Sequence, residues 1–165
     1  MNKVIVVDAN DNVIALKPRQ EITPTDLYRV SVAWIKNSQG KVLLAKRKAD
    51  KLVNPGCWGP AVSGTLEESE TYESNIHKEL QEELGLTDCK LRMIAKIPPA
   101  ERCNYFIAIY ETIMDIDINK DLVLQESEVD EVAWFDLEEL KEEIDTNPST
   151  FVSSAPYWKS WGILG

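Results

Sequence analysis

The sequence predicts an α+β fold with a mixed β-sheet, and three observations support this prediction. Several short apolar segments are spaced as strands, one long amphipathic segment lies near the middle, and a second helical segment comes late. These segments do not alternate regularly, which disfavours a doubly wound parallel sheet. The 165 residues, 44% of them hydrophobic, are enough to bury the core of one domain over residues 1–165.

The first apolar runs predict two β-hairpins. Residues 4–8 and 13–16 flank a turn-rich Ala-Asn-Asp-Asn segment, which predicts a small N-terminal hairpin over about residues 3–17. Residues 30–35 and 41–45 flank the turn sequence Asn-Ser-Gln-Gly and predict the second hairpin.

A helix is predicted over residues 70–84. Gly85 follows at the position where helices usually stop. One apolar stripe recurs every four residues and would face the core: Tyr72, Ile76, Leu80 and Leu84.

The remainder of the chain predicts three strands, a helix and a packed tail. Residues 91–97, 105–113 and 132–135 have strand patterns, and a capping-box-like sequence opens a helix over 136–144. The end of the chain is too aromatic for a disordered tail, so we expect residues 136–165 to form a helix and a tail that packs on the domain. That tail carries Phe151, Tyr157, Trp158 and Trp161.

Charge and composition exclude several classes of function. The 28 acidic residues exceed the 18 basic ones, and this surface repels nucleic acids and anionic membranes, so we expect neither as a partner. No apolar run could span a membrane, and the N-terminal apolar stretch is too short for a signal peptide. Three widely spaced cysteines suit neither a disulfide framework nor a zinc site and favour the cytoplasm. The single histidine, His77, excludes sites that need two.

Three glutamates would share one face of the predicted helix. Glu79, Glu82 and Glu83 stand at i, i+3 and i+4, near the end where the helix dipole disfavours negative charge. A bound cation would offset this repulsion, and three hard oxygen ligands suit Mg²⁺ or Mn²⁺. The spacing alone is also compatible with a solvated acidic face.

The segment around these glutamates resembles the Nudix box. Residues 64–86 read Gly-x5-Glu-x7-Lys-Glu-Leu-x-Glu-Glu-x-Gly-Leu. Every fixed position of the family pattern is matched except one, where Lys78 replaces the family's arginine. Because so many positions match at fixed spacings, the resemblance is specific.

The resemblance extends over roughly residues 30–144. The strand 42–47 ends in an arginine, a Pro-Gly-Cys-Trp sequence at 55–58 precedes the box, and the acidic turn and Trp-containing strand at 128–135 follow it. The N-terminal hairpin and the aromatic tail resemble the branch that holds bacterial Nudix hydrolases and type I isopentenyl diphosphate isomerases.

The resemblance implies an α/β/α sandwich with a mixed sheet and a loop-helix-loop box. The Gly64 carbonyl and the carboxylates of Glu79, Glu82 and Glu83 would hold Mg²⁺ or Mn²⁺. Water would attack phosphorus in a nucleoside diphosphate derivative or a similar small diphosphate, so the implied activity is that of a metal-dependent pyrophosphohydrolase. A homodimer is a further expectation at the level of the family.

Supporting roles also follow from the resemblance. Glu70 would pair with Lys78 and steady the box helix, although lysine lacks the bidentate fork of arginine. Glu128 lies where the family's late-loop glutamate would fall, so it is a candidate general base. The alternatives are a solvated turn at Glu128 and a base among the box glutamates.

Candidate substrate contacts come from arginines and aromatic residues. Arg47 and Arg29 would bind phosphate, although lone arginines at strand ends also form surface ion pairs. Trp58, with Tyr105 and Trp158, would stack on a ring of the substrate, although large aromatic residues also fill cores.

Two other functions are weighed against hydrolysis. In the isomerases a catalytic cysteine and a metal-binding histidine follow the tryptophan that aligns with Trp58, and here those positions are Ser63 and Thr65. The acid/base thiol and the histidine ligands are therefore missing. A catalytically silent ligand-binding module is the other alternative, and the intact box glutamates argue against it.

Overall fold

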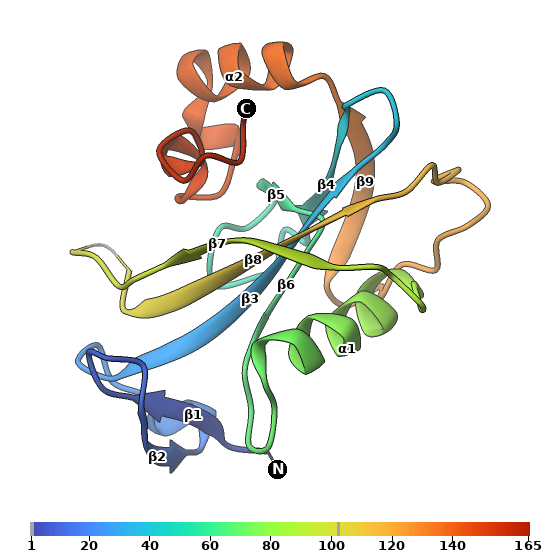
Figure 1. The fold of residues 1–165 in the computed structure, drawn as a ribbon. Coiled ribbons are helices and arrows are strands. Elements are labelled where there is room, and N and C mark those ends of the chain that lie inside the picture. Colours follow the sequence, from blue (N-terminus) through green and yellow to red (C-terminus); the bar gives the residue numbers. More distant parts are fainter. Residues whose placement is uncertain (1, 102) are drawn as a thin grey trace.

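The computed structural model describes residues 2–101 and 103–165. Within these residues nine strands form one mixed sheet, and a helix lies on each side of it (Figure 1). Helix α1 (Tyr72–Leu84) packs on one face, while α2 (Leu137–Thr146) and the C-terminal tail pack on the other. The predicted α+β class and the α/β/α sandwich are therefore confirmed. No helix in the described part of the chain has the length and apolarity to cross a membrane.

The N-terminal hairpin forms as predicted. Strands β1 (Val4–Val7) and β2 (Val13–Lys17) pair antiparallel, and β1 also pairs with β3 (Leu27–Lys36). A 3₁₀ turn, η1 (Arg19–Glu21), lies between β2 and β3. The four residues of β1 are all buried, and Ile5 and Val7 pack in one cluster with Leu66 and Phe106.

Strand β3 lies at the centre of the sheet. It pairs antiparallel with β1, with β4 (Val42–Arg47) and with β6 (Val62–Thr65), and it runs parallel to β8 (Tyr105–Ile113). The β3–β4 hairpin is the second predicted hairpin. Strands β6 and the short β5 (Trp58–Pro60) are not predicted from the sequence, because glycine and proline interrupt the segment that forms them.

Helix α1 has defined caps at both ends. The Thr71 side chain accepts a hydrogen bond from the Ser74 N–H, and the Thr71 N–H donates one to the Ser74 Oγ, so the two residues form a capping box. Gly85 ends the helix in the left-handed region at φ 70°. Ile76, Leu80 and Leu84 are fully buried, so the predicted apolar stripe faces the sheet.

The later elements follow the predicted order with shifted ends. Strand β7 (Arg92–Ile97) pairs with β8 and agrees closely with the prediction. Strand β9 (Val129–Phe135) begins three residues earlier than predicted, because its acidic residues face away from the core while its edge pairs with β4. Helix α2 starts after the N-cap Asp136 and ends at Thr146, two residues beyond the predicted end.

The tail packs back on the sheet as predicted. After α2 the chain forms two 3₁₀ turns, η2 (Pro148–Thr150) and η3 (Ala155–Tyr157). Trp158 is fully buried and meets Trp34 edge-on, with ring centroids 5.2 Å apart. Phe151 is also buried, whereas Tyr157 stays 40% exposed.

We expect the α1–sheet contact to dominate stability on its face of the sheet. Leu80→Ala should lower the free energy of unfolding by about 2–5 kcal/mol, because it removes a fully buried side chain and leaves a cavity. The adjacent, exposed Gln81→Ala should change the same quantity by less than about 0.5 kcal/mol. Urea unfolding of both variants measures the difference, and equal effects would contradict the packing described.

Candidate active site

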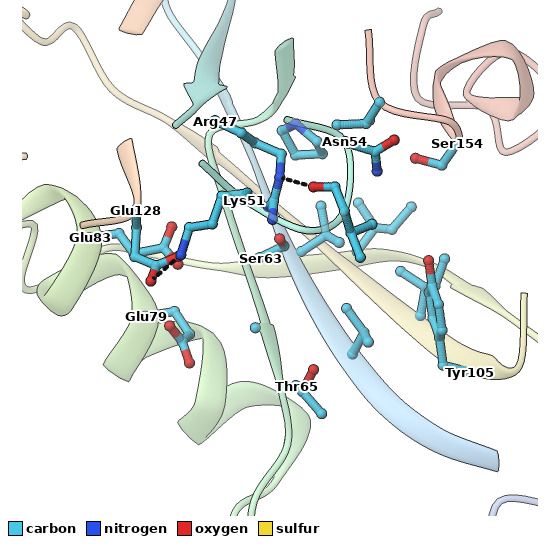
Figure 2. Close-up of a pocket in the computed structure, with 18 of the residues that line it drawn as sticks. Arg47, Lys51, Asn54, Ser63, Thr65, Glu79, Glu83, Tyr105, Glu128 and Ser154 are labelled. Atoms are coloured by element: carbon cyan, nitrogen blue, oxygen red, sulfur yellow. Dashed lines mark hydrogen bonds and ion pairs between the residues drawn. The ribbon is translucent and has the colours of Figure 1, made fainter. Parts of the chain in front are cut away.

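A pocket of about 660 Å³ opens between α1, the sheet and the C-terminal tail. Glu79, Glu83 and Glu128 lie on one side of it, while Tyr105 lies on the opposite side (Figure 2). Arg47 and Lys51 reach in from the loop side. The pocket therefore brings acidic, basic and apolar groups to one cavity.

The floor of the pocket consists of side chains from three neighbouring strands. Residues paired directly across strands put their side chains on the same face of the sheet. The register pairs Tyr28 with Tyr105 in the first row. The second row holds Thr65, Val30 and Ile107, and the third holds Ser63, Val32 and Ile109. All eight side chains line the pocket, so strand register alone builds its floor.

Gly64 allows helix α1 to approach strand β6 closely. A Cβ atom at this position would lie only 2.6 Å from the Glu79 Oε1 atom. No side chain can occupy that space while Glu79 keeps its place. Glu79 can therefore keep this position only because residue 64 is glycine, and the Gly64 backbone lies beside the Glu79 carboxylate.

The buried carboxylates of the helix resist ionisation. Burial raises the pKa of Glu79 to about 7, with Lys78 opposing the shift and Glu82 adding to it. Burial also raises the pKa of Glu83 to about 8, and the neighbouring carboxylates of Glu79 and Glu128 contribute. A positive charge in this part of the pocket would favour the ionised forms.

The glutamates share a face of α1 without converging on one point. Within residues 2–101 and 103–165, no three His, Cys, Asp or Glu side chains are gathered closely enough to hold a metal ion. Their chemistry nevertheless suits a hard divalent cation, because such ions prefer oxygen ligands and these side chains offer carboxylate oxygens. Gly64, which has no side chain, lies beside the Glu79 carboxylate. Glu82 is exposed at the rim of the same pocket.

The ion pair expected between Glu70 and Lys78 is present. The Lys78 Nζ atom lies 2.5 Å from Glu70 Oε1, and it also approaches Glu67 and Glu79 at 3.6 and 3.7 Å. Burial would raise the pKa of Glu70, but the Glu67 N–H, Lys78 and Asn75 together lower it below its usual value. Glu70 thus connects the loop before α1 to the middle of the helix.

Two basic residues reach the pocket from β4 and the loop after it. Arg47 donates through Nε to the Val53 carbonyl at 2.9 Å, which holds the guanidinium against the pocket wall. The Lys51 Nζ atom lies 2.7 Å from a carboxylate oxygen of Glu128. Sequence reasoning missed Lys51. The signal that could have found it is its position four residues after Arg47, in a loop that turns back at a Pro-Gly sequence.

Arg29 lies outside the pocket lining. Its Nε donates to the Asp11 carboxylate at 2.7 Å, and its guanidinium stands over the Tyr72 ring at 5.4 Å. The reason is strand alternation, because Tyr28 and Val30 face the pocket and the residue between them faces the other side. We therefore do not retain Arg29 as a phosphate-binding residue.

The aromatic candidates divide between the pocket and the core. Trp58 lies outside the pocket lining and packs edge-on against Phe135, with ring centroids 5.1 Å apart. Tyr105 and Trp158 do line the pocket. Tyr28, which pairs with Tyr105, was missed because the sequence does not reveal which strands are neighbours.

The chain resembles known proteins over most of its length. A family model described as NUDIX domain matches residues 26–154. An uncharacterized Nudix hydrolase of Nostoc sp. is 32% identical over 117 residues, which cover 68% of this chain and 69% of the relative. A prenyl-diphosphate phosphatase of Methanosarcina mazei is 28% identical, over 88% of this chain and 85% of its own.

The fold has counterparts among solved structures. A protein of Deinococcus radiodurans superimposes with a TM-score of 0.84, covering 96% of this chain and 98% of its own. The two sequences are 22% identical, so this likeness concerns the fold alone.

The raised pKa of Glu83 predicts a pH-dependent loss of stability in metal-free protein. The unfolded chain releases this proton near pH 4.5, whereas the folded chain retains it up to about pH 8. Between these values the folded state binds more protons, so its stability falls as the pH rises. Glu83→Gln removes this dependence.

We therefore expect the melting temperature of Glu83→Gln in EDTA to rise relative to that of the unmodified protein as the pH increases from about 4.5 to 8. Differential scanning calorimetry over this range measures the gain. The exposed Glu73→Gln on the same helix is the control and should show no such trend. A gain of the same size at both ends of the range would contradict the burial of a carboxyl proton at Glu83.

Proposed function

The chain belongs to the Nudix family of hydrolases, and from this premise we propose that it hydrolyses a small diphosphate with the help of Mg²⁺ or Mn²⁺. Nudix enzymes hydrolyse pyrophosphate bonds and generally use divalent metal ions. The observation that carries the proposal is the pocket itself, which the carboxylates of α1 line together with Arg47 and Lys51. Metal-bridged phosphates need both kinds of charge at one site.

The residues that would hold the cation are those beside Gly64. We assign the Gly64 carbonyl and the carboxylates of Glu79, Glu82 and Glu83 to this role. When bound, a divalent cation would neutralise phosphate charge and lower the pKa of a water molecule. Glu70 and Lys78 would fix the helix that carries these glutamates.

The proposed reaction is an attack of water on phosphorus. The water oxygen bonds to one phosphorus atom and the bridging P–O bond breaks, so the bridging oxygen leaves with the other phosphoryl group. The water proton passes to Glu128, which faces the pocket on the same side as Glu83. Lys51 orients this carboxylate through their 2.7 Å ion pair, and Arg47 binds the phosphate oxygens.

Two substrate classes follow from the pocket and the relatives. The family resemblance favours a nucleoside diphosphate derivative. The similarity to a prenyl-diphosphate phosphatase supports a prenyl diphosphate as the second class.

The two competing functions lack support at the same pocket. Ser63 and Thr65 line its floor at the isomerase cysteine and histidine positions, and none of the described lining residues is Cys or His. A silent binding module would have no use for Glu79 and Glu83, whose charged forms burial and mutual repulsion make unfavourable.

Activity should require the cation. Turnover should vanish in EDTA and return with Mg²⁺ or Mn²⁺, and Glu82→Gln should lower it at least about tenfold, because a carboxylate that binds the ion is lost. Chromatographic detection of the phosphorylated products from a panel of prenyl diphosphates and nucleoside diphosphate derivatives is the measurement, with Glu73→Gln as the control. Full turnover in EDTA would refute the metal site.

Glu128 should affect the chemical step rather than cation binding. If it is the general base, Glu128→Gln should lower kcat about 10²-fold or more and leave the Mg²⁺ affinity nearly unchanged. The exposed Glu126→Gln, two residues away, is the control. A kcat within about twofold would assign Glu128 to a solvated turn, and a large loss of Mg²⁺ affinity would make it a metal ligand.

A further inference from the structure

One surface loop contacts two of the groups to which we assign the reaction. The loop over residues 48–57 joins β4 to β5, and its Val53 carbonyl accepts the hydrogen bond from Arg47 Nε at 2.9 Å. Lys51, in the same loop, forms the 2.7 Å ion pair with Glu128. The orientations of the phosphate-binding arginine and of the proposed base therefore both depend on where this loop lies.

Apolar packing does not hold the tip of this loop. Leu52 is fully exposed and Val53 is 65% exposed. Hydrogen bonds within the loop, such as the one from the Gly56 N–H to the Lys48 carbonyl at 3.3 Å, fix its shape without attaching it to the domain. Lys48 also reaches Asp130 at 3.4 Å, but an ion pair this exposed contributes little. The position of the tip must therefore come from another polar contact.

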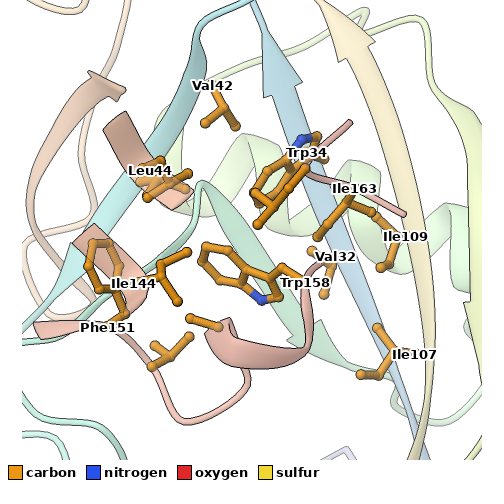
Figure 3. Packing of buried hydrophobic residues seen from close by; sticks show 14 residues of the cluster. Val32, Trp34, Val42, Leu44, Ile107, Ile109, Ile144, Phe151, Trp158 and Ile163 are labelled. Atoms are coloured by element: carbon orange, nitrogen blue, oxygen red, sulfur yellow. The ribbon is translucent and has the colours of Figure 1, made fainter. Parts of the chain in front are cut away.

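The C-terminal tail offers the loop a fixed support. Phe151, Trp158 and Ile163 are buried in the core cluster on the tail side of the sheet (Figure 3). The Val152 N–H donates to the Trp58 carbonyl at 2.8 Å, so the tail is also bound to β5, directly after the loop. Side chains buried in a core hold the backbone that carries them, and this makes the tail more rigid than the loop beside it.

Asn54 connects the loop tip to this support. Its Oδ1 atom accepts a hydrogen bond from the Ser153 N–H at 3.1 Å. Asn54 directly follows Val53 and lines the pocket (Figure 2). It adopts a left-handed backbone at φ 49°, a conformation that asparagine tolerates better than most residues. At the base of the loop, the Cys57 thiol donates to the Ser149 carbonyl at 3.5 Å, which is a weaker bond.

We propose that Asn54 is a positioning residue for the reaction, because it fixes the loop tip to the tail. Through its neighbours it places the Arg47 guanidinium and, by way of Lys51, the Glu128 carboxylate. The inference rests on the proposed function, in which these two groups bind phosphate and accept the water proton. Asn54 acts through geometry and needs no contact with the reacting atoms, since a small displacement of groups that must meet the substrate lowers the rate steeply.

Two substitutions remove this hydrogen bond from opposite sides. Asn54→Gly deletes the acceptor and keeps the left-handed backbone, which glycine adopts without strain. Ser153→Pro deletes the donor. The Ala155 N–H donates to the Val152 carbonyl at 2.9 Å, so Ser153 is the second residue of a turn, where proline is favoured. Asn37→Gly is the matched control, because Asn37 Oδ1 also accepts backbone hydrogen bonds, in the β3–β4 turn outside the pocket lining.

The kinetic test uses geranyl diphosphate and ADP-ribose as probes, one from each substrate class, with chromatographic detection of the products. Asn54→Gly and Ser153→Pro should each lower kcat/KM about five- to tenfold and leave the Mg²⁺ affinity nearly unchanged. The double variant should stay within about twofold of the single variants, because both changes remove one and the same bond. Asn37→Gly should retain kcat/KM within about twofold. Multiplied losses in the double variant would contradict the role of this hydrogen bond.

The NMR signal of the Arg47 Nε–H gives a second readout that needs no turnover, and Arg47→Lys identifies the signal by removing it. In Asn54→Gly and Ser153→Pro the signal should shift to the position typical of exposed arginines, because the Val53 carbonyl is no longer held in place. Asn54→Asp keeps an acceptor oxygen and should keep the signal, as should Asn37→Gly. An unchanged signal in both Asn54→Gly and Ser153→Pro would overturn the proposal. A shifted signal in a protein that cleaves no diphosphate would refute the proposed function and uphold the placement of Arg47 by Asn54.

Discussion

The pairing of β3 with β8 is the constraint on which the rest of the structure depends. Nine residue pairs fix the register of the two strands. Along β3 the even-numbered positions from Tyr28 to Trp34 face the pocket and the tail, while Ala33 and Ile35 pack under α1. A slip by one residue would exchange the two faces and move the whole floor away from the site. One register therefore sets both the core under the helix and the cavity beside it.

The carboxylate face of α1 is held in place at an electrostatic cost. Its glutamates repel one another and are partly withdrawn from water, which raises the pKa of Glu79 and Glu83. The local structure compensates through packing on the opposite side, where Ile76, Leu80 and Leu84 are fully buried, and through Lys78. The apolar face of the helix thus provides the stability that lets the glutamate face carry unfavourable charge. Such perturbed charged groups are common at functional sites.

The sequence predicted most clearly what depends on local spacing. The box helix, its glutamates and the Glu70–Lys78 pair follow from positions a few residues apart, and the structure brings them together. Groups that meet only through tertiary pairing were harder to predict. Whether Lys51 reaches the pocket depends on the path of a loop. The placing of Tyr28 depends on which strand neighbours β3, and that of Arg29 depends on the face of β3 that it occupies. The β5–β6 segment was missed because its glycines and proline conceal a strand that tertiary pairing imposes.

The tail residues that line the pocket, which we call its roof, follow the last strand in the chain, and this separates their ordering from that of the sheet. The strands lie between Val4 and Phe135, whereas the roof residues come after α2. Segments that pack on a finished sheet can open at a lower free energy than the strands beneath them. A molecule bound in the pocket would touch both the sheet and the tail, so occupancy of the pocket and docking of the tail are thermodynamically linked. By reciprocity, whatever loosens the tail weakens retention of the occupant by the same free energy.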